Sequence, residues 1–132
     1  MSETAVNAQD IISLSKREGF LAKQLYVIFT TPANGMKPVM DNIKEHLAFR
    51  VELEKNGTMF ATGPNWSDDE RYWEGDGMVV IRAKSLAEAK EIAARDPMHR
   101  SGARKFTVRP WLVNEGTISV RLNHSKGTFE MT

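Results

Sequence analysis

Residues 35–57, GMKPVMDNIKEHLAFRVELEKNG, predict the long helix around which the rest of the chain can be arranged. The apolar residues of this stretch recur at steps of three and four, the spacing of one helix face: Met40, Ile43, Leu47 and Val51. Pro38 suits a first helical turn and Asn56-Gly57 suits a helix end, so we expect the helix over residues 38–55. His46 lies beside the predicted apolar face, one turn before Arg50, and stands out as a candidate for chemistry.

The segments on either side of this helix predict strands and a second helix. Runs rich in β-branched, aromatic or alternating apolar residues predict strands at 25–30, 58–62, 77–83 and 103–110. Ser85 and Glu88 have the spacing of a capping box, so a helix should begin there and end before Pro97. Outside this region we expect a helix over residues 5–18 and a strand over residues 117–122.

The order of the central elements predicts the fold. Between residues 23 and 111 it is β-α-β-β-α-β, the order of a ferredoxin-like α+β fold with an antiparallel sheet. We therefore expect three parts: an N-terminal helical extension (1–22), the ferredoxin-like domain (23–112), and a C-terminal strand and tail (113–132). Several strand residues supply more apolar surface than two helices can cover, which favours a homodimer or higher homo-oligomer paired sheet against sheet: Tyr26, Ile28, Val79, Ile81, Phe106 and Val108.

Composition excludes several classes of function. The 132 residues carry a formal net charge of +1, which recommends neither nucleic acid nor an anionic membrane as partner. The absence of cysteine removes disulfides, thiolate nucleophiles and cysteine metal sites. The apolar runs are too short to span a bilayer, and the first ten residues lack the features of a secretory signal. We expect a cytoplasmic protein with no membrane partner.

Residues 65–76, NWSDDERYWEGD, predict a polar loop that carries Trp66, Tyr72 and Trp73. These aromatic side chains either pack onto the protomer or a partner subunit, or form a lid over an apolar ligand. The consecutive acids in the loop are expected to be solvated, and the remaining histidines have no companion at metal-ligand spacing, so we predict no metal site. The basic residues Arg100, Arg104, Lys105 and Arg109 predict a wet sheet edge rather than a nucleic-acid surface.

His46 and Asp96 are the residues that could meet in a pocket and perform chemistry. A histidine can take and return a proton near neutral pH, and a neighbouring carboxylate fixes its tautomer. Each has an alternative: His46 could be satisfied at the edge of the core, and Asp96 could bond the local backbone of a turn. Arg50 could pair with Glu54 or hold a substrate carboxylate.

An ordered set of short motifs carries a resemblance to a known family: His46-Leu47 with Arg50, Gly57, Ala61-Thr62-Gly63-Pro64, Ser85-Leu86-Ala87-Glu88-Ala89, Asp96-Pro97, Gly102 and Val108-Arg109-Pro110-Trp111. Over about residues 24–112 the sequence resembles YciI-like (YCII-related) proteins. The resemblance implies a ferredoxin-like protomer that pairs as a dimeric α+β barrel, and a cleft whose histidine and aspartate, here His46 and Asp96, are the suspected catalytic pair. The fold is related to that of muconolactone isomerases and small cofactor-free monooxygenases. Members often accompany the degradation of aromatic compounds, and lyase activity toward chlorinated hydroxylated rings is known.

The chain departs from the short family pattern in its N-terminal extension, its tryptophan-rich loop and its C-terminal extension, so the substrate does not carry over. We expect a small enzyme without a cofactor, a lyase or isomerase acting on a cyclic or aromatic-derived metabolite. In it His46 would move a proton, Asp96 would orient His46, and substrate would contact Arg50, Gly63, Pro64, Trp66 and Trp73. The alternatives are a non-catalytic protein for ligand binding or assembly, and a cofactor-free monooxygenase.

Overall fold

The computed structural model describes residues 4–132, which form two compact units. Gln24–Leu112 is one unit, and Met1–Lys23 with Val113–Thr132 is the other. Residues 1–3, the start of the predicted N-terminal extension, lie outside the described residues. The predicted domain boundaries stay a prediction, and each unit is described by itself.

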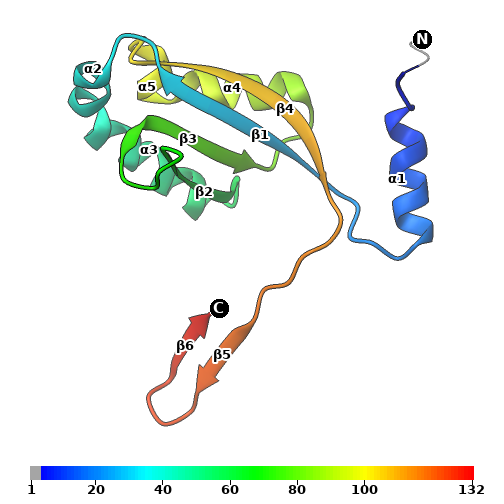
Figure 1. Ribbon diagram of the computed structural model, residues 1–132. Coiled ribbons are helices and arrows are strands. Elements are labelled where there is room, and N and C mark those ends of the chain that lie inside the picture. Colours follow the sequence, from blue (N-terminus) through cyan, green and yellow to red (C-terminus); the bar gives the residue numbers. More distant parts are fainter. Residues whose placement is uncertain (1–3) are drawn as a thin grey trace. The chain divides into compact units, whose positions relative to one another are not determined.

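The larger unit is a four-stranded sheet with helices on one face (Figure 1). Its strands are β1 (Lys23–Pro32), β2 (Met59–Trp66), β3 (Trp73–Ile81) and β4 (Arg104–Val113). They lie in the order β2-β3-β1-β4, and β3 runs antiparallel to both β1 and β2. This order and the alternation with helices confirm the predicted ferredoxin-like α+β fold.

The predicted long helix is divided in two, α2 (Met36–Asp41) and α3 (Ile43–Lys55). Asn42 separates them with ψ of 4°, and its side chain donates to the carbonyl of Pro38 at 2.8 Å. The division breaks the period that the apolar stripe followed across residues 40–51, and the stripe is not a core face. Three of its members are 48–53% exposed: Met40, Leu47 and Val51. Instead His46 and Leu53 are the buried side chains of α3.

The core lies between the sheet and the helices α3 and α4 (Leu86–Arg95). The nine buried residues of this cluster are Tyr26, Ile28, Leu53, Val79, Ile81, Ala89, Ile92, Ala93 and Val108, with Phe106 packed against them. The strand residues expected to need a partner's cover therefore all face the helices of their own protomer, and that argument for pairing is wrong. By strand alternation Phe29 and Met78 point to the opposite face, where they are register partners and partly exposed.

The predicted loop over residues 65–76 is half strand. β2 continues to Trp66 and β3 begins at Trp73, and these two residues pair across the strands. Only residues 67–72 form the connection, which Ser67 closes by donating its N–H to the carbonyl of Tyr72 at 2.8 Å. Asp69 accepts from the Ser67 hydroxyl at 2.7 Å and from the Arg71 N–H at 3.0 Å, so this acid builds the turn. The loop was predicted too long because the polar residues at its tip outnumber Trp66 and Trp73, the strand residues that pair on either side of it.

The second helix begins and ends as predicted, and a further helix follows it. The Ser85 hydroxyl accepts the Glu88 N–H at 3.1 Å, which confirms the N-cap of α4. Pro97 ends α4 but also occupies the first turn of a short helix, α5 (Pro97–Arg100). Asp96 is the junction: it is the C-cap of α4 and the N-cap of α5.

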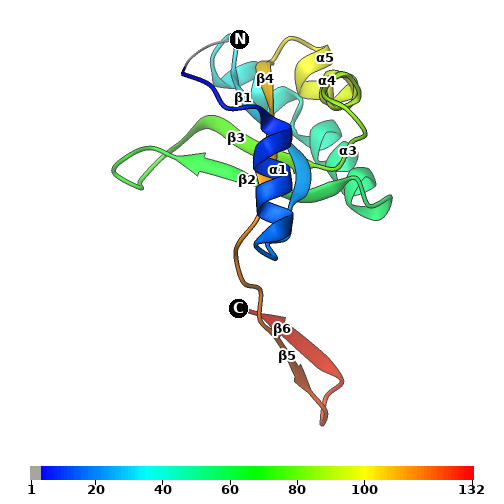
Figure 2. The same cartoon turned by 90° about the vertical axis from the view of Figure 1, so that its right-hand side faces the viewer.

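The smaller unit holds α1 (Ala8–Arg17) and a hairpin of β5 (Val120–Asn123) and β6 (Thr128–Met131), whose two strands lie side by side in Figure 2. The predicted strand over 117–122 is shorter and later, and β6 lies where a polar tail was expected. Asn114 joins the segments of this unit: its amide donates to the Ser15 hydroxyl at 3.0 Å and its oxygen accepts the Ala22 N–H at 3.2 Å. Across residues 4–132, every helix is too short or too polar to cross a bilayer.

Candidate active site

His46 and Asp96 meet in the interior of the larger unit, as the sequence suggested. They are 2% and 5% exposed. Nδ1 of His46 lies 2.9 and 2.8 Å from the two carboxylate oxygens of Asp96. α3 carries the histidine, and the junction between α4 and α5 carries the aspartate. Fifty residues of sequence therefore separate two groups that the packing of α3 on α5 brings into contact.

Asp96 performs the local task expected of its turn as well as holding the histidine. Its Oδ1 accepts the Met98 N–H at 2.8 Å, which caps α5. The cap fixes the carboxylate, and the carboxylate in turn assigns the proton of the neutral imidazole to Nδ1. Nε2 is then the unprotonated ring nitrogen of His46.

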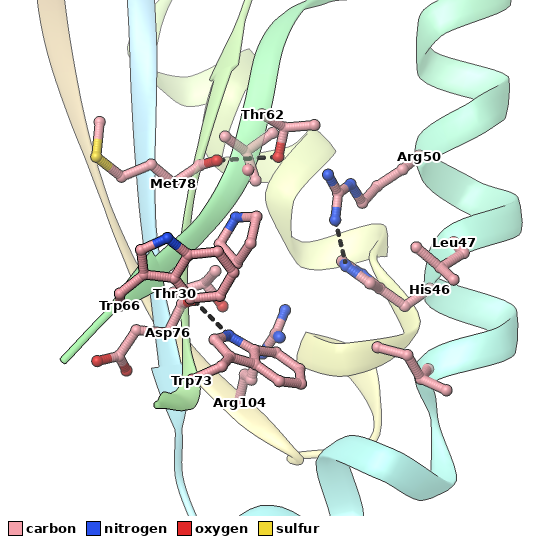
Figure 3. Close-up of a pocket in the computed structure, with 15 residues that line it drawn as sticks. Thr30, His46, Leu47, Arg50, Thr62, Trp66, Trp73, Asp76, Met78 and Arg104 are labelled. Carbon is pink, nitrogen blue, oxygen red and sulfur yellow. Dashed lines mark hydrogen bonds between the residues drawn. The ribbon is translucent and has the colours of Figure 1, made fainter. Parts of the chain in front are cut away.

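Arg50 approaches that second nitrogen. Its Nη1 lies 3.3 Å from Nε2 of His46, a contact drawn as a dashed line in Figure 3. The alternative pairing with Glu54 is absent from the ion pairs of residues 4–132. Arg50 thus extends the pair to a line of three groups, carboxylate, imidazole and guanidinium.

Burial and charge act in opposite directions on this line. Burial by itself raises the pKa of Asp96, but the hydrogen bond and charge of His46, the Met98 N–H and the charge of His99 together lower that pKa below its ordinary value. Burial lowers the pKa of Arg50, and the charge of Asp96 opposes that shift. The carboxylate is therefore ionised at neutral pH.

A pocket of about 310 Å³ lies beside His46, between α3 and the ends of β2 and β3. Figure 3 shows the side chains that line it. Apolar side chains dominate the lining: Ile43, Leu47, Pro64, Trp66, Trp73 and Val79. The pocket brings together six of the seven residues predicted for the site, namely His46, Arg50, Gly63, Pro64, Trp66 and Trp73, and Asp96 lies behind His46.

The aromatic residues of the β2–β3 hairpin differ in their surroundings. Trp73 is half-buried, packs against Val39 and Met98, and donates its indole N–H to the carbonyl of Asp76 at 2.9 Å. Trp66 is 61% exposed at the edge of the pocket, and Tyr72 is exposed and does not line it. Trp73 thus packs onto its own protomer. Of the three aromatic residues, only Trp66 is still a candidate for a lid over a ligand.

Four polar residues of the pocket lining were not predicted as site residues: Thr30, Thr62, Asp76 and Arg104. Arg104 is buried, so its assignment to a wet sheet edge is wrong. A signal existed, because Phe106 and Val108 were placed on the inner face of their strand and Arg104 precedes Phe106 by two residues. Strand alternation alone would have turned Arg104 inward. Among residues 4–132, no group of three or more His, Cys, Asp or Glu side chains could hold a metal ion.

The fold and this site define a ferredoxin-like α+β protein with a pocket of ligand size and a buried histidine–carboxylate pair at its wall. Residues 24–112 match the family model of the YCII-related domain, and these bounds are those of the larger unit. The chain belongs to this family.

A solved structure supports the same fold. It is the 5-chloro-2-hydroxyhydroquinone dehydrochlorinase of Burkholderia phenoliruptrix AC1100 in complex with 2,5-dihydroxybenzoquinone. The two chains share 22% identity with a TM-score of 0.54, over 66% of this chain and 92% of that one. Among curated proteins, none matches the chain.

Proposed function

We propose that this protein is a small enzyme without a cofactor, a lyase or isomerase that moves a proton on a cyclic, aromatic-derived metabolite. The observation that carries the proposal is the buried contact of 2.8 Å between Nδ1 of His46 and Asp96. It leaves Nε2 as a base at the wall of an apolar pocket. A histidine that only filled space in the core would need neither a buried carboxylate nor an adjoining cavity.

The proposed step begins with a substrate carbon that carries a hydrogen beside a carbonyl group. Nε2 of His46 takes that proton, and the electron pair of the broken C–H bond moves to the carbonyl oxygen to form an enolate. Asp96 stabilises the imidazolium, and the Arg50 guanidinium stabilises the enolate. In a lyase the enolate then collapses and expels a leaving group, such as chloride, with its electron pair. In an isomerase the imidazolium returns the proton to another carbon.

Two observations support a single-ring substrate. The pocket volume of about 310 Å³ is at the lower end of the range for ligand sites. The structurally similar dehydrochlorinase was solved with a one-ring dihydroxyquinone. Trp66, at the edge of the pocket, is proposed as a partial cover that excludes water when substrate is bound.

The experiment is a turnover assay with chlorinated hydroxyhydroquinones, following chloride release and the loss of substrate absorbance. His46→Asn is expected to abolish turnover while ligand still binds, because the pocket is retained without its base. His124→Asn is the matched control, since His124 is exposed in the smaller unit. Unchanged turnover in His46→Asn would overturn the mechanism. Binding of these compounds without any turnover would instead support the non-catalytic alternative.

We also propose that two protomers pair through the open face of the sheet. Phe29 and Met78 are 43% and 36% exposed there as opposite register partners. Apolar neighbours of this size on one sheet face are what a dimer interface covers. Sedimentation velocity is expected to show a dimer that Phe29→Lys weakens, and a monomer at every concentration would contradict the proposal.

A further inference from the structure

Arg104 is a buried cation that forms no direct ion pair with the residues that the structure describes. Arg104 is the first residue of β4 and is 6% exposed. Its Nε is buried and has no hydrogen-bond partner. None of the ion pairs within residues 4–132 includes it. Burial of an unpaired guanidinium is strongly unfavourable, so a protein keeps one where something else uses the charge.

Arg50 presents the same feature from the other side of the pocket. Its Nε is also buried and unpartnered, and its Nη1 contact is to Nε2 of His46 rather than to a carboxylate. Both arginines line the pocket, and Figure 3 shows them on the helix and strand sides of it. Burial lowers the pKa of Arg104, the charge of Asp96 opposes that shift, and the charge of Arg50 adds to it, so the two guanidinium groups lie within electrostatic range of each other.

The carboxylates near the two arginines are engaged elsewhere. Asp96 accepts from His46 and from the Met98 N–H, and Asp76 accepts from the Thr31 hydroxyl. Neither forms an ion pair with Arg50 or Arg104 within the described part of the chain. The pocket is therefore lined by two guanidinium groups, each with a buried Nε that has no hydrogen-bond partner.

Trp73 holds Arg104 in position. The guanidinium carbon of Arg104 lies 5.9 Å from the centroid of the Trp73 ring, over its face. Such a contact orients the planar guanidinium without using its N–H donors. The donors remain available to a ligand.

We propose that Arg104 and Arg50 bind an anionic oxygen group, a carboxylate or an enolate, on a ring-shaped ligand. A guanidinium fork matches either group with two hydrogen bonds, and the apolar walls receive the ring. The inference rests on the pocket of the proposed function and names its substrate class: the enzyme acts on an anion rather than on a neutral ring. It also gives Arg104 a role, as the second guanidinium that holds the anionic group of the substrate together with Arg50.

The test is a binding titration followed by calorimetry with matched pairs of probes. Benzoate is compared with benzamide, and 2,5-dihydroxybenzoquinone, ionised at neutral pH, with its neutral dimethyl ether. We expect the wild-type protein to favour the anion in each pair by about tenfold or more, as charge-assisted bonds to a guanidinium imply. A preference for benzoate alone identifies a carboxylate site, and a preference for the ionised quinone alone identifies an enolate site.

Arg104→Met is expected to abolish the preference while affinity for the neutral probe stays within about twofold. Arg109→Met is the matched control, because Arg109 is exposed on the same strand and does not line the pocket. A preference that survives in Arg104→Met, or is absent from the wild type, overturns the inference.

If Arg104→Met does not fold, two measurements on folded protein decide. Added salt must weaken wild-type binding of the anions and leave the neutral probes unaffected. Arg50→Gln must reduce the preference. Failure of both refutes the anion site. The proposed function is judged separately, since His46→Asn abolishes turnover but is expected to keep the preference for anions.

Discussion

Replacement of Asp96 by asparagine and by alanine separates the two tasks of this side chain. Alanine removes the N-cap of α5, which costs about 0.5–2 kcal/mol, and leaves the buried Nδ1–H of His46 without an acceptor, which costs about 1–3 kcal/mol. Asparagine keeps one oxygen that can accept from Met98 and His46, but it loses the charge and places an amide NH2 where Oδ2 lies 2.8 Å from Nδ1, a cost of about 1 kcal/mol. Because Asp96 is 5% exposed, water cannot replace the lost acceptor.

Urea unfolding measures these losses. With a slope of roughly 1–3 kcal/mol per molar urea, alanine should lower the midpoint by about 1–2 M and asparagine by about 0.5 M. Turnover should fall by about 10²–10⁴ in the asparagine variant, because the amide no longer stabilises the imidazolium. The control is Asp41→Asn, whose ion pair with Lys37 is exposed and screened by water and salt.

Two outcomes would refute this reasoning. Equal loss of stability in the two variants would mean that Oδ1 does not support α5. Full turnover in the asparagine variant would mean that the carboxylate does nothing for His46, and the pair would then be only a structural contact.

Three further predictions concern stability. The pKa of Asp96 is lowered in the folded protein, so its contribution is complete above the unfolded value of about 3.9 and is lost as pH falls below it. Acid titration of unfolding should therefore show the wild type losing its advantage over Asp96→Asn below about pH 4, and a constant difference would contradict this. Ser85→Ala should cost about 1 kcal/mol in urea unfolding, since it removes the acceptor for the Glu88 N–H at 3.1 Å; no change would mean that this cap is not formed. Trp73→Ala should cost about 3 kcal/mol through the contacts of its indole with the core, whereas exposed Trp66→Ala should cost no more than about 0.5 kcal/mol and act on ligand binding; equal costs would contradict the assignment of Trp66 to the pocket edge.

The order of elements was predictable because its signals are local, whereas the pairing of His46 with Asp96, fifty residues apart, rested on the family resemblance. Ser85 with Glu88 marks the start of α4, and Asp96-Pro97 marks its end. Both signals are independent of tertiary contacts. A ferredoxin-like order then brings the first helix against the end of the second. His46 lies on the first of these helices and Asp96 lies at the end of the second.

The failures share a tertiary cause. Spacing alone assigned Leu47 to the core, but the inner face of α3 borders a pocket as well as the core, so His46 and Arg50 turn inward. Arg104 was assigned to solvent because arginine is usually exposed, yet its place on β4 faces the same pocket. Sequence patterns assume that inward-facing residues are apolar, and a polar-lined cavity breaks that assumption. The local sequence does not predict where such a cavity lies.

The double duty of Asp96 affects how this position can change during evolution. A descendant that no longer needed the reaction would still need the acceptor for Met98, so selection for folding alone keeps aspartate or asparagine here. His46 has no such second task among its contacts. Among relatives, the histidine should therefore disappear first when activity is lost. An aspartate that persists without its histidine would mark a protein that has kept the helix cap and abandoned the chemistry.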